Sequence, residues 1–293
     1  MARKISARED GFRRVLRSSL AALSISLALV LPAAAAELKQ KTIEAYERYV
    51  RQASQRVERE LGHRNPFLWV DTAAEPFRRA LLEQLRHGEV VIERLHETGA
   101  DGKALKAPDG LIHHWVGTVF IPGAKLTDVL ALVQDYDRHQ EIYKPDVLRS
   151  RTLERTGDDF KIHLRFLKKK VITVVVDTDH DVNYRRISPA RAASHSRTTR
   201  VLEVENHGKP GERHKPEGND GGFLWRLDTF WRFDERDGGT YVQCESVSLT
   251  RDIPIGLGWI VGPFVNGVPR ESLVFTLGTT RTALLRSGHT AND

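Results

Sequence analysis

Residues Phe223–Phe233 read FLWRLDTFWRF, and the alternation in this stretch decides the fold. Large side chains occupy every second position, and three charged residues lie between them. Successive side chains of a strand point to opposite faces, so this pattern predicts a strand with one apolar and one polar face. The apolar face carries Phe223, Trp225, Leu227, Thr229, Trp231 and Phe233, and the other carries Arg226, Asp228 and Arg232. We expect the apolar face to be the concave side of a sheet.

The chain leaves this strand through Asp237-Gly238-Gly239 and enters a second strand-like run, Thr240–Arg251. A short glycine-containing link between two such runs predicts a β-hairpin. Upstream, further strand-like runs separated by turn residues are Leu111–Ile121, Val147–Arg155, Asp159–Lys168, Val171–Tyr184 and Arg191–Glu205. A helix is predicted after Pro122-Gly123, and a last helix from Pro269. The succession predicts an α+β fold in which a curved antiparallel sheet grips a long C-terminal helix, with helices on one face and an apolar cavity between.

This order of elements resembles the helix-grip fold of START-like proteins, also called the SRPBCC superfamily. It is most similar to the polyketide-cyclase and coenzyme-Q-binding branch. The similarity covers residues 111–286 and is carried by VLALVQDYDRHQEIY at Val129–Tyr143 and WRFDERDGGTYV at Trp231–Val242. The resemblance implies a cavity for a hydrophobic ligand and no fixed cofactor. It does not imply one chemistry, because related folds carry many functions.

Two segments lie outside this similarity. Residues 37–110 are predicted to be a mainly helical N-terminal segment, with amphipathic helices over 38–61 and after Pro76 and a strand at Glu89–Leu95. We expect this segment either to cap the cavity or to bind a partner. Residues 287–293 form a short tail.

Residues 1–36 have the order of a secretory signal peptide: a basic leader, an uncharged run at Leu20–Leu31, then Pro32 and four alanines. We expect cleavage after Ala36 or Ala35 and an exported product, periplasmic or secreted. Arg13-Arg14 leaves the choice between the general and the twin-arginine route open. The leader has six basic and two acidic residues, a net charge of +4 out of +6 for the chain, so the remaining +2 does not favour nucleic acid as a partner.

The expected ligand-binding residues come from the predicted concave face and the helices at its mouth. Tyr136 and Tyr143 would present hydroxyls to a ligand head group. The run Arg191–Glu205 alternates Ser194, Ser196, Thr198 and Arg200 against a second polar face, so either orientation turns polar groups inward. The complete predicted set is Tyr136, Tyr143, Leu164, Phe166, Arg200, Trp225, Leu227 and Trp231.

The apolar segment Ile253–Val268 has no charge, four glycines and two prolines, so a regular helix there is costly. Either it is a packed connection, or it is a gate, with Trp259 and Phe264, that opens towards a membrane. Lys168-Lys169-Lys170 is a basic tip that is either solvated or in transient contact with anionic lipid.

These patterns lead to three hypotheses for function. The first is an exported binding or carrier protein for a lipid, quinone or polyketide-like molecule. The second is a cyclase or aromatase, with Tyr136, Tyr143, His195 and Arg200 as proton-transfer candidates. The third is a protein-interaction module. No metal site is expected, because the spacings of His113-His114 and of Asp177, Asp179, His180 and Asp181 match no zinc or calcium site. No catalytic residue is assigned, because the sequence has no Gly-x-Ser-x-Gly motif, no phosphate-binding glycine loop and no dinucleotide fingerprint. Cys244, the single cysteine, is expected to be a buried, unreactive thiol, and the sequence leaves the oligomeric state open.

Overall fold

The computed structural model describes residues 39–62, 66–99, 101–170, 172–216, 220–252 and 258–290. Side chains of 258–266 and 288–290 are not included in that description. The leader 1–36 and residues 291–293 of the predicted tail 287–293 therefore lie outside it, as do the side chains of the gate residues Trp259 and Phe264; residues 287–290 belong to the last helix. No described helix is long and apolar enough to cross a membrane.

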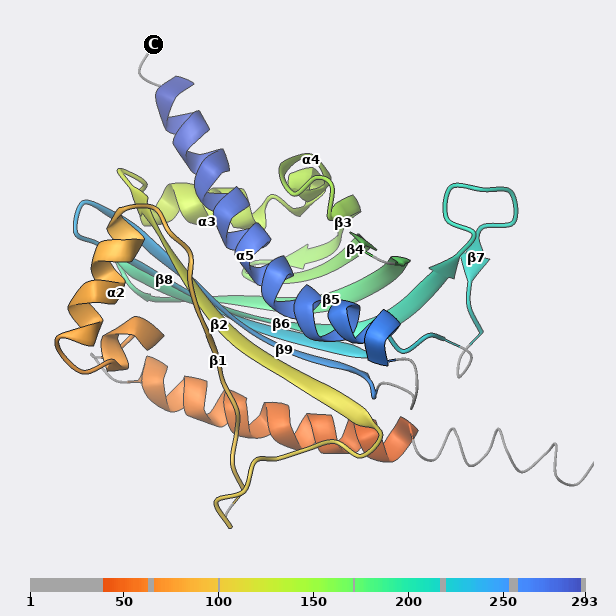
Figure 1. Ribbon diagram of the computed structural model, residues 1–293. Helices are drawn as coiled ribbons and strands as arrows, with labels where there is room; N and C mark the ends of the chain where they lie inside the picture. Colours follow the sequence, from red (N-terminus) through yellow and green to blue (C-terminus); the bar gives the residue numbers. More distant parts are fainter. Residues whose placement is uncertain are drawn as a thin grey trace, which may run out of the picture.

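One antiparallel sheet of nine strands forms the centre of the molecule (Figure 1). Its strands run in the order β1-β2-β9-β8-β6-β5-β4-β3, with the short β7 paired to β6. The α+β helix-grip class predicted from the sequence is confirmed. Strand β1 lies within the strand predicted at Glu89–Leu95, and the short β7 is the one strand of the described residues that was not predicted. The bounds are β1 Val91–Arg94, β2 Gly110–Pro122, β3 Val147–Thr156, β4 Asp159–Lys169, β5 Thr173–Ser188, β6 Arg191–Glu205, β7 Arg213–His214, β8 Arg226–Arg236 and β9 Gly239–Arg251.

The hairpin between β8 and β9 turns through Asp237 and Gly238, which both have positive φ, 56° and 75°. Two consecutive residues of this kind define the turn whose twist matches that of paired strands. The turn sets the register of the hairpin, and the chain then closes the sheet by pairing β9 with β2 along their full length.

Helices cover the concave face of the sheet, and the long α5 runs across it (Figure 1). These elements are α3 Leu126–Gln134, the single 3-10 turn η2 Tyr136–Arg138, α4 His139–Ile142 and α5 Gly258–Thr290. The expectation that the last helix begins at Pro269 is wrong, because α5 begins at Gly258 and takes in most of the predicted gate. Glycine propensity is a weak prior, and extending an existing helix costs far less than nucleating one.

A second helical layer covers the convex face. It comprises a helix over 39–61, called here the N-terminal helix, with η1 Trp69–Thr72 and α2 Phe77–Arg86. Tyr46, Val50 and Val57 of the N-terminal helix belong to one apolar core with Phe230 and Val247 of the sheet. The expectation that helices pack on one face only is therefore wrong: the sheet is the middle of three layers, and the N-terminal helix lies on the side away from α5 (Figure 1).

The convex face buries polar as well as apolar groups. Glu245 of β9 is 2 % exposed, and it accepts hydrogen bonds from Nε2 of His114 at 2.8 Å and from Arg56 of the N-terminal helix. A carboxylate only accepts, so Nε2 of His114 carries the proton and Nδ1 accepts from the Tyr49 hydroxyl at 2.8 Å. The same hydroxyl accepts from the Glu97 backbone N–H at 2.9 Å. This buried network fixes the N-terminal helix to the sheet.

A cavity between the sheet and the C-terminal helix

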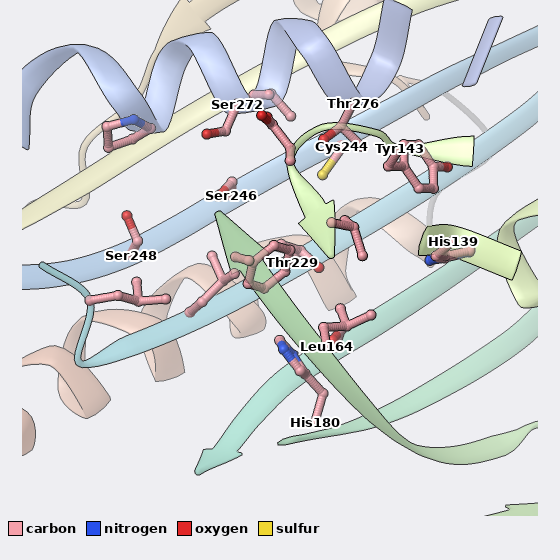
Figure 2. A pocket seen from close by; sticks show the side chains of 18 of the residues that line it. His139, Tyr143, Leu164, His180, Thr229, Cys244, Ser246, Ser248, Ser272 and Thr276 are labelled. Atoms are coloured by element: carbon pink, nitrogen blue, oxygen red, sulfur yellow. Dashed lines mark hydrogen bonds between the residues drawn. The ribbon is translucent and has the colours of Figure 1, made fainter. Parts of the chain in front are cut away.

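A cavity of about 270 Å³ lies between the concave face of the sheet and α5 (Figure 2). Its floor is made by β4, β5, β6, β8 and β9, and α4 and η2 close one end. The volume is near the lower end of the range of roughly 300–1,000 Å³ found for small-molecule pockets.

The end of the cavity at α4 is aromatic. The Tyr136 and Tyr184 hydroxyls are 2.8 Å apart, and the Tyr143 hydroxyl is 3.0 Å from that of Thr280 on α5. The ring of His139 lies between Tyr136 and Tyr143, with centroids 4.8 and 4.9 Å away. Burial raises the pKa of Tyr143 to about 12 and that of Tyr136 well above its usual value, so both phenols stay protonated and donate or accept hydrogen bonds.

The walls on β4 and β5 are apolar. Every second residue of β4 from Ile162 to Phe166 lines the cavity, namely Ile162, Leu164 and Phe166. Val176 and Val182 of the neighbouring strand β5 line it as well. Trp231 and Leu227 of β8 continue this surface across the floor. The remaining apolar residues of the wall are Val133, Val147, Val174, Phe223, Leu224, Val268, Pro269, Leu273 and Phe275.

Hydroxyl groups occupy the middle of the floor. Ser196 of β6 lies directly opposite Thr229 of β8, which lies directly opposite Ser246 of β9, so three hydroxyl residues form a row across three strands. We call Ser196, Thr229 and Ser246 the hydroxyl row. Ser248 follows on the same face of β9, and Ser272 of α5 lies above the floor (Figure 2).

The imidazole of His180 is buried in the wall next to this row. Its Nε2 is 2.9 Å from the Thr178 hydroxyl and its Nδ1 is 3.2 Å from the Ser196 hydroxyl. Burial lowers the pKa of His180 to about 4, against the opposing charges of Asp228 and Asp179, and burial likewise lowers the pKa of His139 to about 4. Both rings are therefore neutral at neutral pH.

The cavity wall also includes one ion pair. Lys168, at the end of β4, donates to the Asp146 carboxylate and lies 5.8 Å from the centre of the Phe275 ring. Lys170 of the same basic tip pairs with Glu271 of α5 at 2.7 Å. The described part of the tip is thus partly neutralised by its neighbours.

Six of the eight residues predicted to bind a ligand lie in the cavity wall. They are Tyr136, Tyr143, Leu164, Phe166, Leu227 and Trp231. Whether they bind a ligand stays a prediction. The other two, Arg200 and Trp225, are not in the wall. The side chains of the predicted gate residues Trp259 and Phe264 lie outside the described part of the structure.

Arg200 lies on the opposite face of the sheet because β6 contains a bulge. Asp179 pairs with Arg200 and the next residue, His180, pairs with Thr198, so Thr199 is an extra residue that reverses the alternation. The Arg200 guanidinium therefore reaches the Asp179 carboxylate at 2.7 Å on the outer surface.

Trp225 precedes β8 and is buried on the convex side. It shares the apolar core of the N-terminal helix, and its Nε1 donates to Asp220 at 2.8 Å. Lys39 lies over its ring at 5.5 Å. The alternation inferred from the sequence holds from Leu227 onwards but not before β8 begins.

Sequence reasoning missed His139, His180 and the serines of β9 as cavity residues. One signal was present: Val242, Cys244, Ser246, Ser248 and Thr250 share one parity, so the cavity face of β9 changes from apolar to hydroxyl-bearing along the strand. Burial raises the pKa of the Cys244 thiol well above its usual value, as expected for an unreactive cysteine. The described residues contain no group of three or more side chains able to hold a metal ion.

No family model and no curated protein matches the sequence. Solved structures with a similar fold include the STAR-related lipid transfer protein from Xanthomonas axonopodis, 18% identical over 65% of this chain and 98% of that one, with a TM-score of 0.41. A second is the Zhui aromatase/cyclase from a Streptomyces strain, 15% identical over 60% of this chain and 95% of that one, TM-score 0.41. A START superfamily protein from Mycobacterium smegmatis is 12% identical over 59% and 98%, TM-score 0.39.

Two of these neighbours are named as a STAR-related and a START superfamily protein. The fold itself is defined by the topology of this chain. Strand β2 pairs with the last strand, the intervening strands follow as successive hairpins, and α5 crosses the concave face. The described chain is therefore a helix-grip fold with an additional helical layer on its convex face.

Proposed function

We propose that this protein binds and carries an apolar small molecule in the cavity between the sheet and α5. The observation that supports this is the composition of the wall. Aliphatic and aromatic side chains predominate in it, and the polar groups between them are mostly uncharged. Such a lining favours transfer of an apolar molecule out of water, while a few polar groups fix its orientation.

Acid–base chemistry finds less support in this cavity. A general acid or base works best when its pKa lies near the working pH. Burial moves the pKa of Tyr143 to about 12 and the pKa values of His139 and His180 to about 4, and it raises the pKa of the Cys244 thiol. These directions favour a binding protein over a cyclase or aromatase.

The place where the carrier acts follows from the leader. Residues 1–36 have the composition of a cleavable export signal, so we propose that the protein works outside the cytoplasm. An apolar molecule that crosses an aqueous compartment needs to be shielded from water, and an apolar cavity in an exported protein meets that need.

The first experiment is to identify the cargo. The mature chain from Glu37 is purified without detergent, extracted with organic solvent, and the extract is analysed by mass spectrometry. A Thr229→Phe variant places an aromatic ring in the cavity floor, and Arg200→Ala changes the outer surface of the same sheet as a control. We expect one class of apolar molecule in the wild type and in Arg200→Ala, and its loss in Thr229→Phe.

The proposal fails if wild type and Thr229→Phe release the same molecules in the same amounts. It also fails if the emptied wild-type protein binds no member of a broad panel of apolar ligands. Urea unfolding of each variant checks that Thr229→Phe remains folded.

A further inference from the structure

The charges of the cavity restrict what it can hold. Among the described residues of the wall, the ionised side chains are Asp146 and Lys168, and these two pair with each other. His180 makes its two ring contacts to the hydroxyls of Thr178 and Ser196, which a neutral imidazole satisfies with one donor and one acceptor nitrogen. The wall so described offers no unpaired positive charge to an anionic ligand.

The hydroxyl row sets a second restriction. Neighbouring strands lie about 4.8 Å apart, so Ser196, Thr229 and Ser246 span roughly 10 Å across the floor. The Ser196 hydroxyl contacts His180, and that of Thr229 accepts from Nε1 of Trp231 at 3.3 Å. A hydroxyl both donates and accepts, so each retains some capacity for a ligand oxygen.

Other polar atoms in the wall lack a partner in the described part of the chain. The Ser246 and Ser248 hydroxyls on the floor, and that of Ser272 on α5, make no hydrogen bond among those residues (Figure 2). Nε2 of His139 is buried in the same wall without a partner. A hydroxyl that faces a cavity without a protein partner is free to bind a ligand, so this concentration of hydrogen-bonding capacity points to a ligand that carries oxygen.

We propose that the ligand is an uncharged apolar molecule with carbonyl or hydroxyl oxygens, which are bound by Ser246, Ser248 and Ser272 beside the hydroxyl row. This inference rests on the proposed function and specifies its ligand class. A carboxylate or phosphate is disfavoured because burying an unpaired charge is far more costly than burying a polar group that can be paired. The volume of about 270 Å³ also favours one compact molecule over a lipid with two acyl chains.

The test uses four ligands with the same twelve-carbon chain: 1-dodecanol, 2-dodecanone, dodecane and dodecanoate. Each competes with Nile red, an uncharged dye that fluoresces in apolar surroundings, for the mature protein at pH 8, where dodecanoate is an anion. We expect the alcohol and the ketone to bind at least tenfold more tightly than the alkane or the anion.

A double variant, Ser246→Ala with Ser248→Ala, removes two unpaired hydroxyls at little cost to packing. We expect it to weaken binding of the alcohol and the ketone by about five- to tenfold, in line with the loss of one or two neutral hydrogen bonds. Dodecane should bind the variant as it binds the wild type. Ser54→Ala, the same chemical change on the N-terminal helix across the sheet, should alter none of the four affinities.

The outcomes separate this inference from the proposed function. Dodecanoate binding as tightly as dodecanol overturns the uncharged ligand class and leaves the carrier function standing. Equal affinity for dodecane and dodecanol, or an unchanged double variant, overturns the role of the serines. Failure of Nile red and all four competitors to bind overturns the proposed function itself.

Discussion

Replacing Glu245 by Gln tests how the N-terminal helix is held on the sheet. Glutamine keeps the shape of the side chain but removes the charge that Arg56 and His114 contact. Arg56 keeps its ion pairs with Glu97 and Glu60, at 3.0 and 3.3 Å, so the substitution isolates the contribution of one buried carboxylate.

The size of the effect follows from the pKa of Glu245. Burial raises this pKa, but the hydrogen bond from His114 and the charge of Arg56 outweigh burial and lower it from 4.5 to about 2. At about 1.4 kcal/mol per pKa unit, this corresponds to roughly 3 kcal/mol of folding stability at pH 7. Because the folded-state pKa is the lower one, the contribution is complete above pH 4.5 and is lost as the pH falls towards 2, roughly halving by pH 3.

Urea unfolding followed by tryptophan fluorescence at pH 7, 5, 4 and 3 measures both features. We expect Glu245→Gln to lower the free energy of unfolding by roughly 3 kcal/mol at pH 7, and the difference from wild type to shrink as the pH falls. Glu58→Gln, on the N-terminal helix, breaks an exposed ion pair with Arg185 of β5 and should cost less than about 1 kcal/mol. A loss for Glu245→Gln that is small at pH 7, or that does not change with pH, would refute the reasoning.

Three further predictions concern the cavity, its histidine and the leader. Trp231→Ala, in the cavity wall, should weaken ligand binding and lower the free energy of unfolding by roughly 1–3 kcal/mol. Trp225→Ala, in the convex core, should lower it by roughly 3–5 kcal/mol and leave ligand affinity unchanged. Titration with Nile red measures the affinity, and urea unfolding measures the stability. The free energy of unfolding of the wild type should fall as the pH falls from 6.5 to 4, because His180 binds a proton in the unfolded state at a higher pH than in the folded state. Urea unfolding over this pH range should show a smaller loss for His180→Asn. In a Gram-negative host the full chain should yield a periplasmic product that begins at Glu37 or Ala36, and mass spectrometry that finds the leader intact would contradict export.

Much of the cavity wall can be predicted from the sequence, because the alternation of side chains along a strand is a local pattern. Along β4 and β8, once one residue is assigned to a face of the sheet, the period of two assigns the others. This reasoning placed Leu164, Phe166 and Trp231 on the face that lines the cavity, where the structure has them. The same reasoning failed for Arg200, because a single extra residue in β6 reverses the alternation and leaves no mark in the residue types.

The sequence by itself determined the elements whose signals are local: the strands through their alternation, the hairpins through glycine turns, and the class of fold through the order of both. Only the tertiary structure decided which faces are buried. Asp228 and Arg232 form a polar face in the sequence, yet they are 1 % and 2 % exposed, because Tyr46 and Glu60 of the N-terminal helix supply their hydrogen bonds. The physical reason is that a polar group can be buried wherever a partner pairs with it, and that partner lies more than 150 residues away along the chain.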